Sequence, residues 1–360
     1  MHEPGELIVA MPALVGFVPE RSLVVVVLAR PQPPKSSSVI SAVMRFDLDQ
    51  NRRGKQGLAA VLAGEVARIC AAEEATEVLA MIIDDRMRDP SRTPTRGSVK
   101  PWATLVAAFA RQLAREKVTL TGAWAVSAIE AGQRWWSLHD TDHEGTLSDP
   151  ADSMVSFAHV LNGHPIHSSR KQLTDLVVQN SDSAKEVAAH LAEAQSAGHN
   201  RFVSAIRRAD PDSYHRRALE KVLHQIATLA SGAVPTAREM AELAVVLRDR
   251  TVRDALLALA VGEHAAAADQ LWVTLVQSLS GTDRAEAAVL LGYSAYVRGD
   301  GPLAGIALDA ALDTDPSHSM AILLDTALRN GMHPQDIRRL ADHGLGIASD
   351  LGIDLGPTHR

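Results

Sequence analysis

Acidic and basic side chains cluster at the ends of two apolar segments that we expect to form strands. Arg45 and Asp47 close one segment, and Asp84 and Asp85 close the other. Ligands of open α/β sheets bind at the carboxyl ends of strands, and paired carboxylates can hold a metal or act as general acid and base. These four residues are therefore the candidate catalytic residues. The alternative is ordinary turn chemistry, which Asp favours at strand ends.

A second polar cluster lies in the sequence HDTDHEG. His139, Asp140, Asp142, His143 and Glu144 offer nitrogen and oxygen ligands that suit zinc or another divalent ion. The carboxylate spacing resembles the start of a calcium-binding loop, but alanine occupies the twelfth position, where such loops place a bidentate glutamate. The alternative is a solvated acidic turn between a strand and a helix.

Three further histidines, His159, His164 and His167, follow closely in the sequence. Three imidazoles and a water can form a catalytic zinc site. Their spacing matches no metallohydrolase motif, and the intervening Asn, Gly and Pro indicate a loop. Isolated histidines in loops and helix caps are the alternative interpretation.

The segment after Asp85 is rich in cations that could attract phosphate. The basic residues of this segment are Arg86, Arg88, Arg92, Arg96 and Lys100. No aromatic residue is interleaved among them for base stacking, and the whole chain carries a formal net charge of −7. A solvated loop is therefore the alternative, and nucleic acid is not an expected partner.

The single cysteine, Cys70, excludes an internal disulfide framework and a cysteine-built zinc site. The chain lacks a phosphate-binding P-loop, a GxGxxG fingerprint, a GxSxG nucleophile elbow and an HExxH motif. We predict no bound cofactor, although a divalent metal is possible at the clusters above. An apolar N-terminal stretch lacks the positive flank of a secretion signal and is interrupted at Pro19, so we expect a cytoplasmic protein without membrane spans.

The elements that must position these residues change in type along the chain. Residues 1–150 combine β-branched runs with helical apolar spacing, which predicts a mixed sheet of about five strands with flanking helices. We expect strands at 22–29, 39–47, 77–84, 118–128 and 133–138, and helices at 56–71 and 102–115. Trp135 and Trp136 alternate across the last strand, so we expect only one of them to face the core.

The remainder of the chain has no convincing strand pattern. We interpret 151–182 as a transitional helical segment, 183–345 as an all-α, partly repeat-like domain, and 346–360 as a C-terminal tail. Within the α-helical domain, residues 284–316 resemble one helical hairpin of a tetratricopeptide repeat, with small residues between the helices and a closing proline. Helices are expected near 183–197, 211–231, 236–248, 251–260, 264–280, 284–298, 302–313, 318–330 and 334–343.

Several segments together resemble an actinobacterial family of unknown function, domain of unknown function 4192. The segment PALVGFVPERSLVVV is the most specific of these segments, and RFDL, RWWS, GDGPLA and ALDAAL fit the same family. The resemblance implies a cytoplasmic protein with an N-terminal α/β part and a C-terminal helical part. It transfers no activity, because the family has none established.

These observations favour a non-enzymatic protein-interaction or regulatory module whose helical domain binds another protein, because stacked helix pairs present binding surfaces. The alternative is a metal-dependent hydrolase or nucleotide-acting enzyme with its site at Arg45, Asp47, Asp84 and Asp85. That alternative requires these side chains to converge in one pocket.

Overall fold

The computed structural model describes residues 3–29, 39–49, 55–87, 100–139, 143–161 and 166–357. The chain divides into two compact units, Met1–Arg170 and Lys171–Arg360, which are described in turn. The first holds a mixed sheet with helices and the second is helical, which confirms the predicted fold class.

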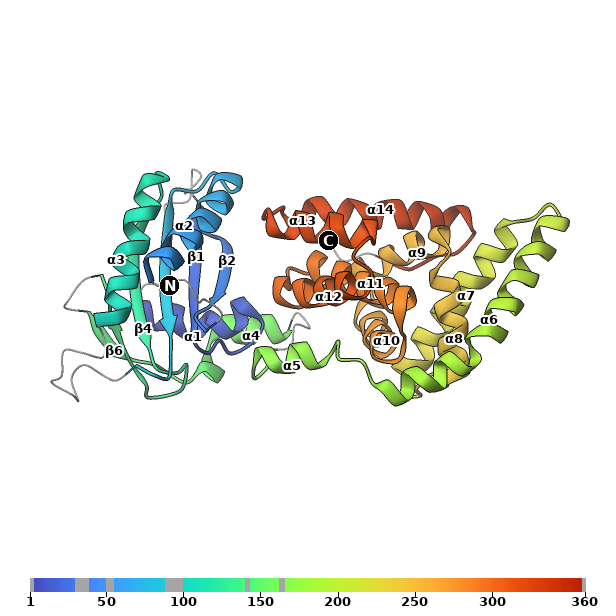
Figure 1. Ribbon diagram of the computed structural model, residues 1–360, viewed down its shortest axis with the longest axis horizontal. Helices are drawn as coiled ribbons and strands as arrows, with labels where there is room; N and C mark the ends of the chain where they lie inside the picture. Colours follow the sequence, from blue (N-terminus) through green and yellow to red (C-terminus); the bar gives the residue numbers. More distant parts are fainter. Residues whose placement is uncertain are drawn as a thin grey trace. The chain divides into compact units, whose positions relative to one another are not determined.

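A six-stranded sheet forms the first unit (Figure 1), in the order β2-β1-β3-β4-β5-β6. The β3 and β4 strands run parallel, and every other neighbouring pair is antiparallel. The short edge strand β6 is the element that the expected five-strand sheet lacked. The strands are β1 (Ser22–Ala29), β2 (Val39–Asp47), β3 (Glu77–Ile83), β4 (Thr119–Val126), β5 (Arg134–Ser137) and β6 (Glu144–Thr146).

The register brings several strand ends to one edge of this sheet. Ser22, the first residue of β1, pairs with both Asp47 of β2 and Ile83 of β3, and Ile83 pairs with Val126 at the end of β4. The start of β1 and the ends of β2, β3 and β4 therefore lie side by side. We call this border the strand-end edge.

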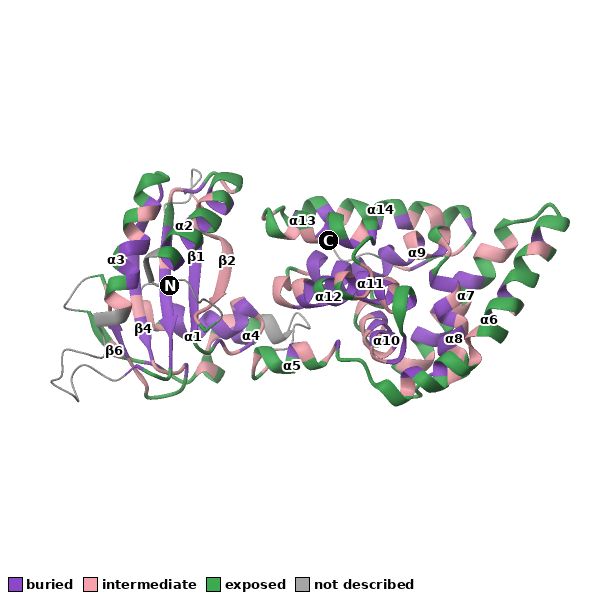
Figure 2. Ribbon diagram, viewed as in Figure 1, coloured by how far each residue is buried: buried purple, intermediate pink, exposed green. Residues whose placement is uncertain are grey.

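Helices cover both faces of the sheet. On one face, α2 (Lys55–Ala72) and α3 (Lys100–Arg115) pack on alternate residues of β1 and β3. On the other face, α1 (Pro4–Val15) buries the apolar N-terminal stretch that sequence reasoning left unassigned. The interior strands are accordingly buried in Figure 2, whereas the edge strand β2 is half-buried. The first unit also contains the short helices η1 (Pro150–Asp152) and α4 (Met154–Leu161).

The two adjacent tryptophans correct one expectation. Trp136 joins the core under α2 and α3, while Trp135 packs beside Gly5 of α1 and Gly145 of β6. Their exposed fractions are 6% and 7%. Both are buried because the sheet is covered on both faces, so the expectation that only one would face the core was wrong.

The second unit contains ten α-helices and one 3-10 helix within the described residues. Most bounds agree with the expected helices, but α6 and α14 extend well beyond their predicted C-terminal ends. The helices are α5 (Arg170–Asp175), which begins at the boundary, α6 (Ser181–Arg207), α7 (Asp212–Ala230), α8 (Ala237–Leu247), α9 (Arg250–Leu256), η2 (Leu257–Val261), α10 (Ala265–Ser278), α11 (Gly281–Val297), α12 (Gly301–Thr314), α13 (Ser319–Arg329) and α14 (Pro334–Asp350).

Close helix packing in this unit depends on small residues. Gly292 of α11 faces Leu308 of α12, so that a Cβ atom at Gly292 would lie 2.9 Å from Leu308 Cγ. The α11–α12 pair forms the hairpin expected at 284–316, and α11 is buried along most of its length. No helix in the described parts of the chain is both long enough and apolar enough to cross a membrane.

Candidate functional site

The strand-end edge holds all four residues predicted as catalytic. Arg45 donates from Nε to the Ser22 hydroxyl at 2.7 Å and pairs with Asp47 at 3.4 Å. Its guanidinium also lies over the Phe17 ring, 5.8 Å from the centroid. Burial lowers the pKa of Arg45. The Arg45–Asp47 pair is thus packed into the sheet surface instead of reaching outward.

Asp84 has no exposed surface, and its carboxylate accepts hydrogen bonds from Arg86. The Arg86 backbone N–H donates to it at 2.9 Å, and the Arg86 guanidinium donates at 2.8 and 2.6 Å. Arg86 also pairs with Asp49 at 2.7 Å and lies over the Trp102 ring. The Asp84 carboxylate is thereby held by a fixed cation.

Asp85 is engaged in the same way by Arg21. The two make a bidentate pair at 2.8 and 3.0 Å, and Arg21 also reaches Asp49 at 3.4 Å. The hydrogen bond from Arg21 lowers the pKa of the Asp85 carboxyl. Asp49 therefore bridges Arg21 and Arg86 and connects the two pairs.

The structure thus brings the four predicted residues to one edge and adds Arg21, Asp49 and Arg86, of which sequence reasoning noted only Arg86. Each aspartate at this edge contacts an arginine. A carboxylate whose oxygens already accept hydrogen bonds from a guanidinium has fewer lone pairs left to bind a metal or to take a proton from a substrate. The ion pairs at this edge connect the loops that follow the strands, and they leave few carboxylate oxygens free to contact a substrate.

The predicted metal cluster at 139–144 is partly outside the described residues, which do not include Asp140 and Asp142. His139 lies in an exposed bend. The His143 carbonyl accepts from the Ser137 backbone at 2.8 Å, and Glu144 pairs with Arg134 at 2.6 Å. Residues 144–146 form strand β6, so this part is not the loop that was expected.

The histidine cluster is also only partly described. His164 and the side chain of His159 lie outside the described residues, and the backbone of His167 bonds to Gly16 and Val18. The basic loop is described only at Arg86, because Arg88, Arg92, Arg96 and the Lys100 side chain are outside as well. Within the described ranges, no group of three or more His, Cys, Asp or Glu residues is placed to hold a metal.

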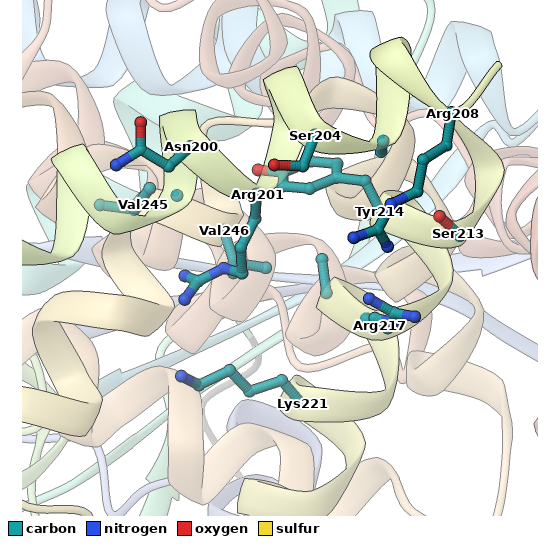
Figure 3. Close-up of a pocket in the computed structure, with 13 residues that line it drawn as sticks. Asn200, Arg201, Ser204, Arg208, Ser213, Tyr214, Arg217, Lys221, Val245 and Val246 are labelled. Carbon is teal, nitrogen blue, oxygen red and sulfur yellow. The ribbon is translucent and has the colours of Figure 1, made fainter. Parts of the chain in front are cut away.

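A pocket of about 410 Å³ lies between α6, α7 and α8 of the helical unit. Four cationic side chains line it, namely Arg201 of α6, Arg208 directly after the end of α6, and Arg217 and Lys221 of α7. Figure 3 shows Arg208 and Arg217 extending toward one end, with the tips of Arg201 and Lys221 at the other. We call this cavity the α6–α8 pocket.

The charge of this pocket is only partly compensated. Lys221 forms an ion pair with Glu242, whereas Arg201, Arg208 and Arg217 have no carboxylate partner among the described residues. Burial lowers the pKa of Lys221, and the nearby Arg201 lowers it further. Three positive charges therefore remain available to an anion.

The remaining lining is aromatic, hydroxylic and apolar. Tyr214 packs edge-on against Phe202, with ring centroids 5.3 Å apart, and burial raises the pKa of Tyr214. Ser204, Ser213, the amide of Asn200 and small or apolar side chains complete the wall. Of the described residues that line the pocket, none is Asp, Glu, His or Cys. The hydroxyls of Ser204, Ser213 and Tyr214 and the amine of Lys221 are the lining groups of a type that can transfer protons or act as nucleophiles.

Sequence reasoning missed this pocket because it ended the first long helix at 197, before the sequence GHNR at 198–201. The helix α6 continues to Arg207, and Gly198 allows close approach to α8, since a Cβ atom there would lie 2.9 Å from Val245. Arg201 lies in the last two turns of α6, and Arg208, seven positions later, follows its last residue, so both side chains reach the same pocket. That spacing was the signal available in the sequence.

These features define a class of protein: an α/β unit followed by a helical unit with an anion-accepting pocket. A family model described as a domain of unknown function (DUF4192) matches residues 4–335, and the chain belongs to this family. The match confirms the resemblance seen in the sequence. No curated protein and no solved structure matches the chain.

Proposed function

We propose that the protein is a non-enzymatic interaction module whose helical unit binds an acidic segment of another protein. The observation that carries this proposal is that Arg201, Arg208 and Arg217 line one pocket without carboxylate partners in the described chain. Unpaired arginines grouped in a concavity are costly to keep together unless an anion joins them, because like charges repel.

The chemistry of the two sites favours binding over catalysis. The described lining of the α6–α8 pocket contains no carboxylate, imidazole or thiol, and its Lys221 amine is engaged in an ion pair with Glu242. The predicted strand-end site has carboxylates, but they form ion pairs with arginines. A metal-dependent hydrolase or nucleotide-acting enzyme is the alternative function, and the ion pairing of the strand-end carboxylates argues against that alternative.

The exposure of the pocket favours a partner larger than a free small molecule. Pockets that hold small ligands enclose most of the ligand surface, whereas Arg201, Arg208 and Arg217 are all exposed. Phe202 and Ile206, on the same helix, expose 39% and 51% of their surface and offer apolar contacts beside the charges. A segment of a protein can use both kinds of contact at once.

The setting of this interaction is proposed as the cytoplasm of an actinobacterium. The buried single cysteine supports a compartment in which disulfides are not used, and the family resemblance supports the source. The α11–α12 hairpin, with Gly292 against Leu308, supports the proposed likeness to one tetratricopeptide repeat.

Affinity capture with chemical cross-linking, using the full chain in its native host, tests the proposal. The triple variant Arg201→Ala, Arg208→Ala, Arg217→Ala should lose most of the partner that the wild type captures. Arg207→Ala is the matched control, because Arg207 is exposed on the same helix but does not line the pocket. Equal capture by wild type and triple variant would refute the proposal.

A further inference from the structure

We infer that the acidic group recognised by the α6–α8 pocket is a phosphate monoester on a side chain of the partner. This inference rests on the proposed function and names the chemistry of that same site. It makes the interaction dependent on phosphorylation of the partner.

The charge balance favours phosphate over carboxylate. A phosphorylated side chain carries a charge between −1.5 and −2 near pH 7, by the ordinary second ionisation of a monoester at about pH 6. Three arginines without carboxylate partners line the pocket in the described chain. Two of them, Arg208 and Arg217, extend toward the same end, where one carboxylate would leave one of their charges uncompensated and a phosphate dianion would compensate both.

The shape of the cationic groups favours the same ligand. Guanidinium groups donate in a planar fork that fits two oxygens of one phosphate, and several forks can share its three terminal oxygens. In Figure 3, Arg208 and Arg217 point into one end of the pocket, and the Tyr214 and Ser204 hydroxyls lie on its wall. Arginine clusters of this kind are a recurring solution for phosphorylated segments.

The apolar surroundings favour a phosphate attached to a polypeptide. The pocket of about 410 Å³ is larger than a phosphate alone requires. Part of its wall is apolar, formed by Ala205, Ala218 and Val246, which are buried. The carbon chain that carries the phosphate can pack there, and neighbouring residues can contact the exposed Phe202 and Ile206.

Degenerate peptide libraries test this inference without knowledge of the partner. Nine-residue peptides with a central phosphoserine, phosphothreonine or phosphotyrosine are passed over immobilised full-length protein, alongside matched libraries with central serine and glutamate. We expect retention of a phosphorylated library at least tenfold above the glutamate library. Peptides sequenced from the retained fraction then serve for calorimetry.

Variants locate the binding in calorimetry. Arg208→Ala and Arg217→Ala should each weaken a retained phosphopeptide by tenfold or more, and Arg208→Lys should also weaken it, because the charge remains but the fork is lost. The control Arg207→Ala should change affinity by less than twofold. Circular dichroism establishes that each exposed-site variant remains folded.

The possible failures are distinguishable. Equal retention of glutamate and phosphorylated libraries would overturn the phosphate inference while leaving the proposed interaction intact. Inorganic phosphate binding as tightly as the retained peptides would show that a free phosphate is the ligand and would overturn the assignment to a side chain. Loss of partner capture in the triple variant, with no phosphorylated library retained, would overturn the inference alone.

Discussion

Gly344 and Gly346 allow one substitution to be compared at two positions of the same helix, α14. A Cβ atom at Gly344 would lie 2.6 Å from the Asp254 carbonyl oxygen and 3.1 Å from backbone atoms of Ala255 and Ala258. At the exposed Gly346, a Cβ atom would meet nothing within 4 Å. We therefore expect Gly344→Ala to destabilise the helical unit and Gly346→Ala to stabilise it.

The magnitude follows from two opposing effects. Replacing Gly by Ala inside a helix stabilises by about 0.5–1 kcal/mol at either position, so this gain cancels when the two variants are compared. The difference between them is the cost of forcing extra volume against backbone, about 1–3 kcal/mol. Because the clashing atoms belong to the backbone, we expect the upper part of that range.

Thermal unfolding followed by circular dichroism at 222 nm measures this difference. A change of 1 kcal/mol shifts the midpoint by about 2–4 °C for a unit of this size, so the two variants should differ by roughly 4–12 °C. A Gly344→Ala protein at least as stable as Gly346→Ala would refute the close approach of α14 to α9 and η2.

Three other outcomes are expected. Arg284→Met should lower the free energy of unfolding by about 3 kcal/mol in urea titrations, because buried acceptors left unpaired are costly. Arg284 donates to the carbonyls of Val276 and Val177 and to the Thr314 hydroxyl. An unchanged unfolding midpoint would contradict this expectation. Cys70 should not react with a disulfide reagent at pH 8 unless urea is added, because burial raises the pKa of its thiol to about 11. Rapid labelling of the folded protein would show that the reagent reaches the core around Cys70. Asp85→Asn should change stability at pH 7 little, because the ion pair that it removes is exposed, and it should lessen the loss of stability in acid. The folded pKa of Asp85 lies below its unfolded value of about 3.9, so the stabilisation present above that value disappears as the pH falls through the folded pKa. Identical acid-unfolding curves for variant and wild type would contradict this account of Asp85.

The interior strands were predictable because their signal is local. The bounds of β1 match its β-branched run and β3 ends one residue before its expected end, since strands buried on both faces give continuous apolar segments. The edge strand β6 has three residues with glycine at its centre, which gives no strand pattern. Its existence depends on pairing with β5, and that pairing is not a property of its own sequence.

The ion pairs of the strand-end edge and the α6–α8 pocket were less predictable, because they depend on contacts between residues far apart in the sequence. Position along the chain indicated that Asp47, Asp84 and Asp85 gather at one edge, because strand ends converge in such folds. The pairing of Asp85 with Arg21, 64 residues earlier, depends on the antiparallel register of β1 and β3. The α6–α8 pocket depends on the packing of three helices, and one of these was ended too early at a glycine that serves helix contact.

The burial of Trp135 has a consequence for how this family can vary in sequence. Its indole would touch a Cβ atom at Gly5 at 3.0 Å and one at Gly145 at 2.8 Å, so one side chain restricts residues 140 positions apart. A larger residue at either glycine requires a smaller residue at Trp135, which would in turn leave a void between α1 and the sheet. Among relatives, substitutions at these three positions should therefore occur together, because the side chain at position 135 packs against both the first helix and the last strand.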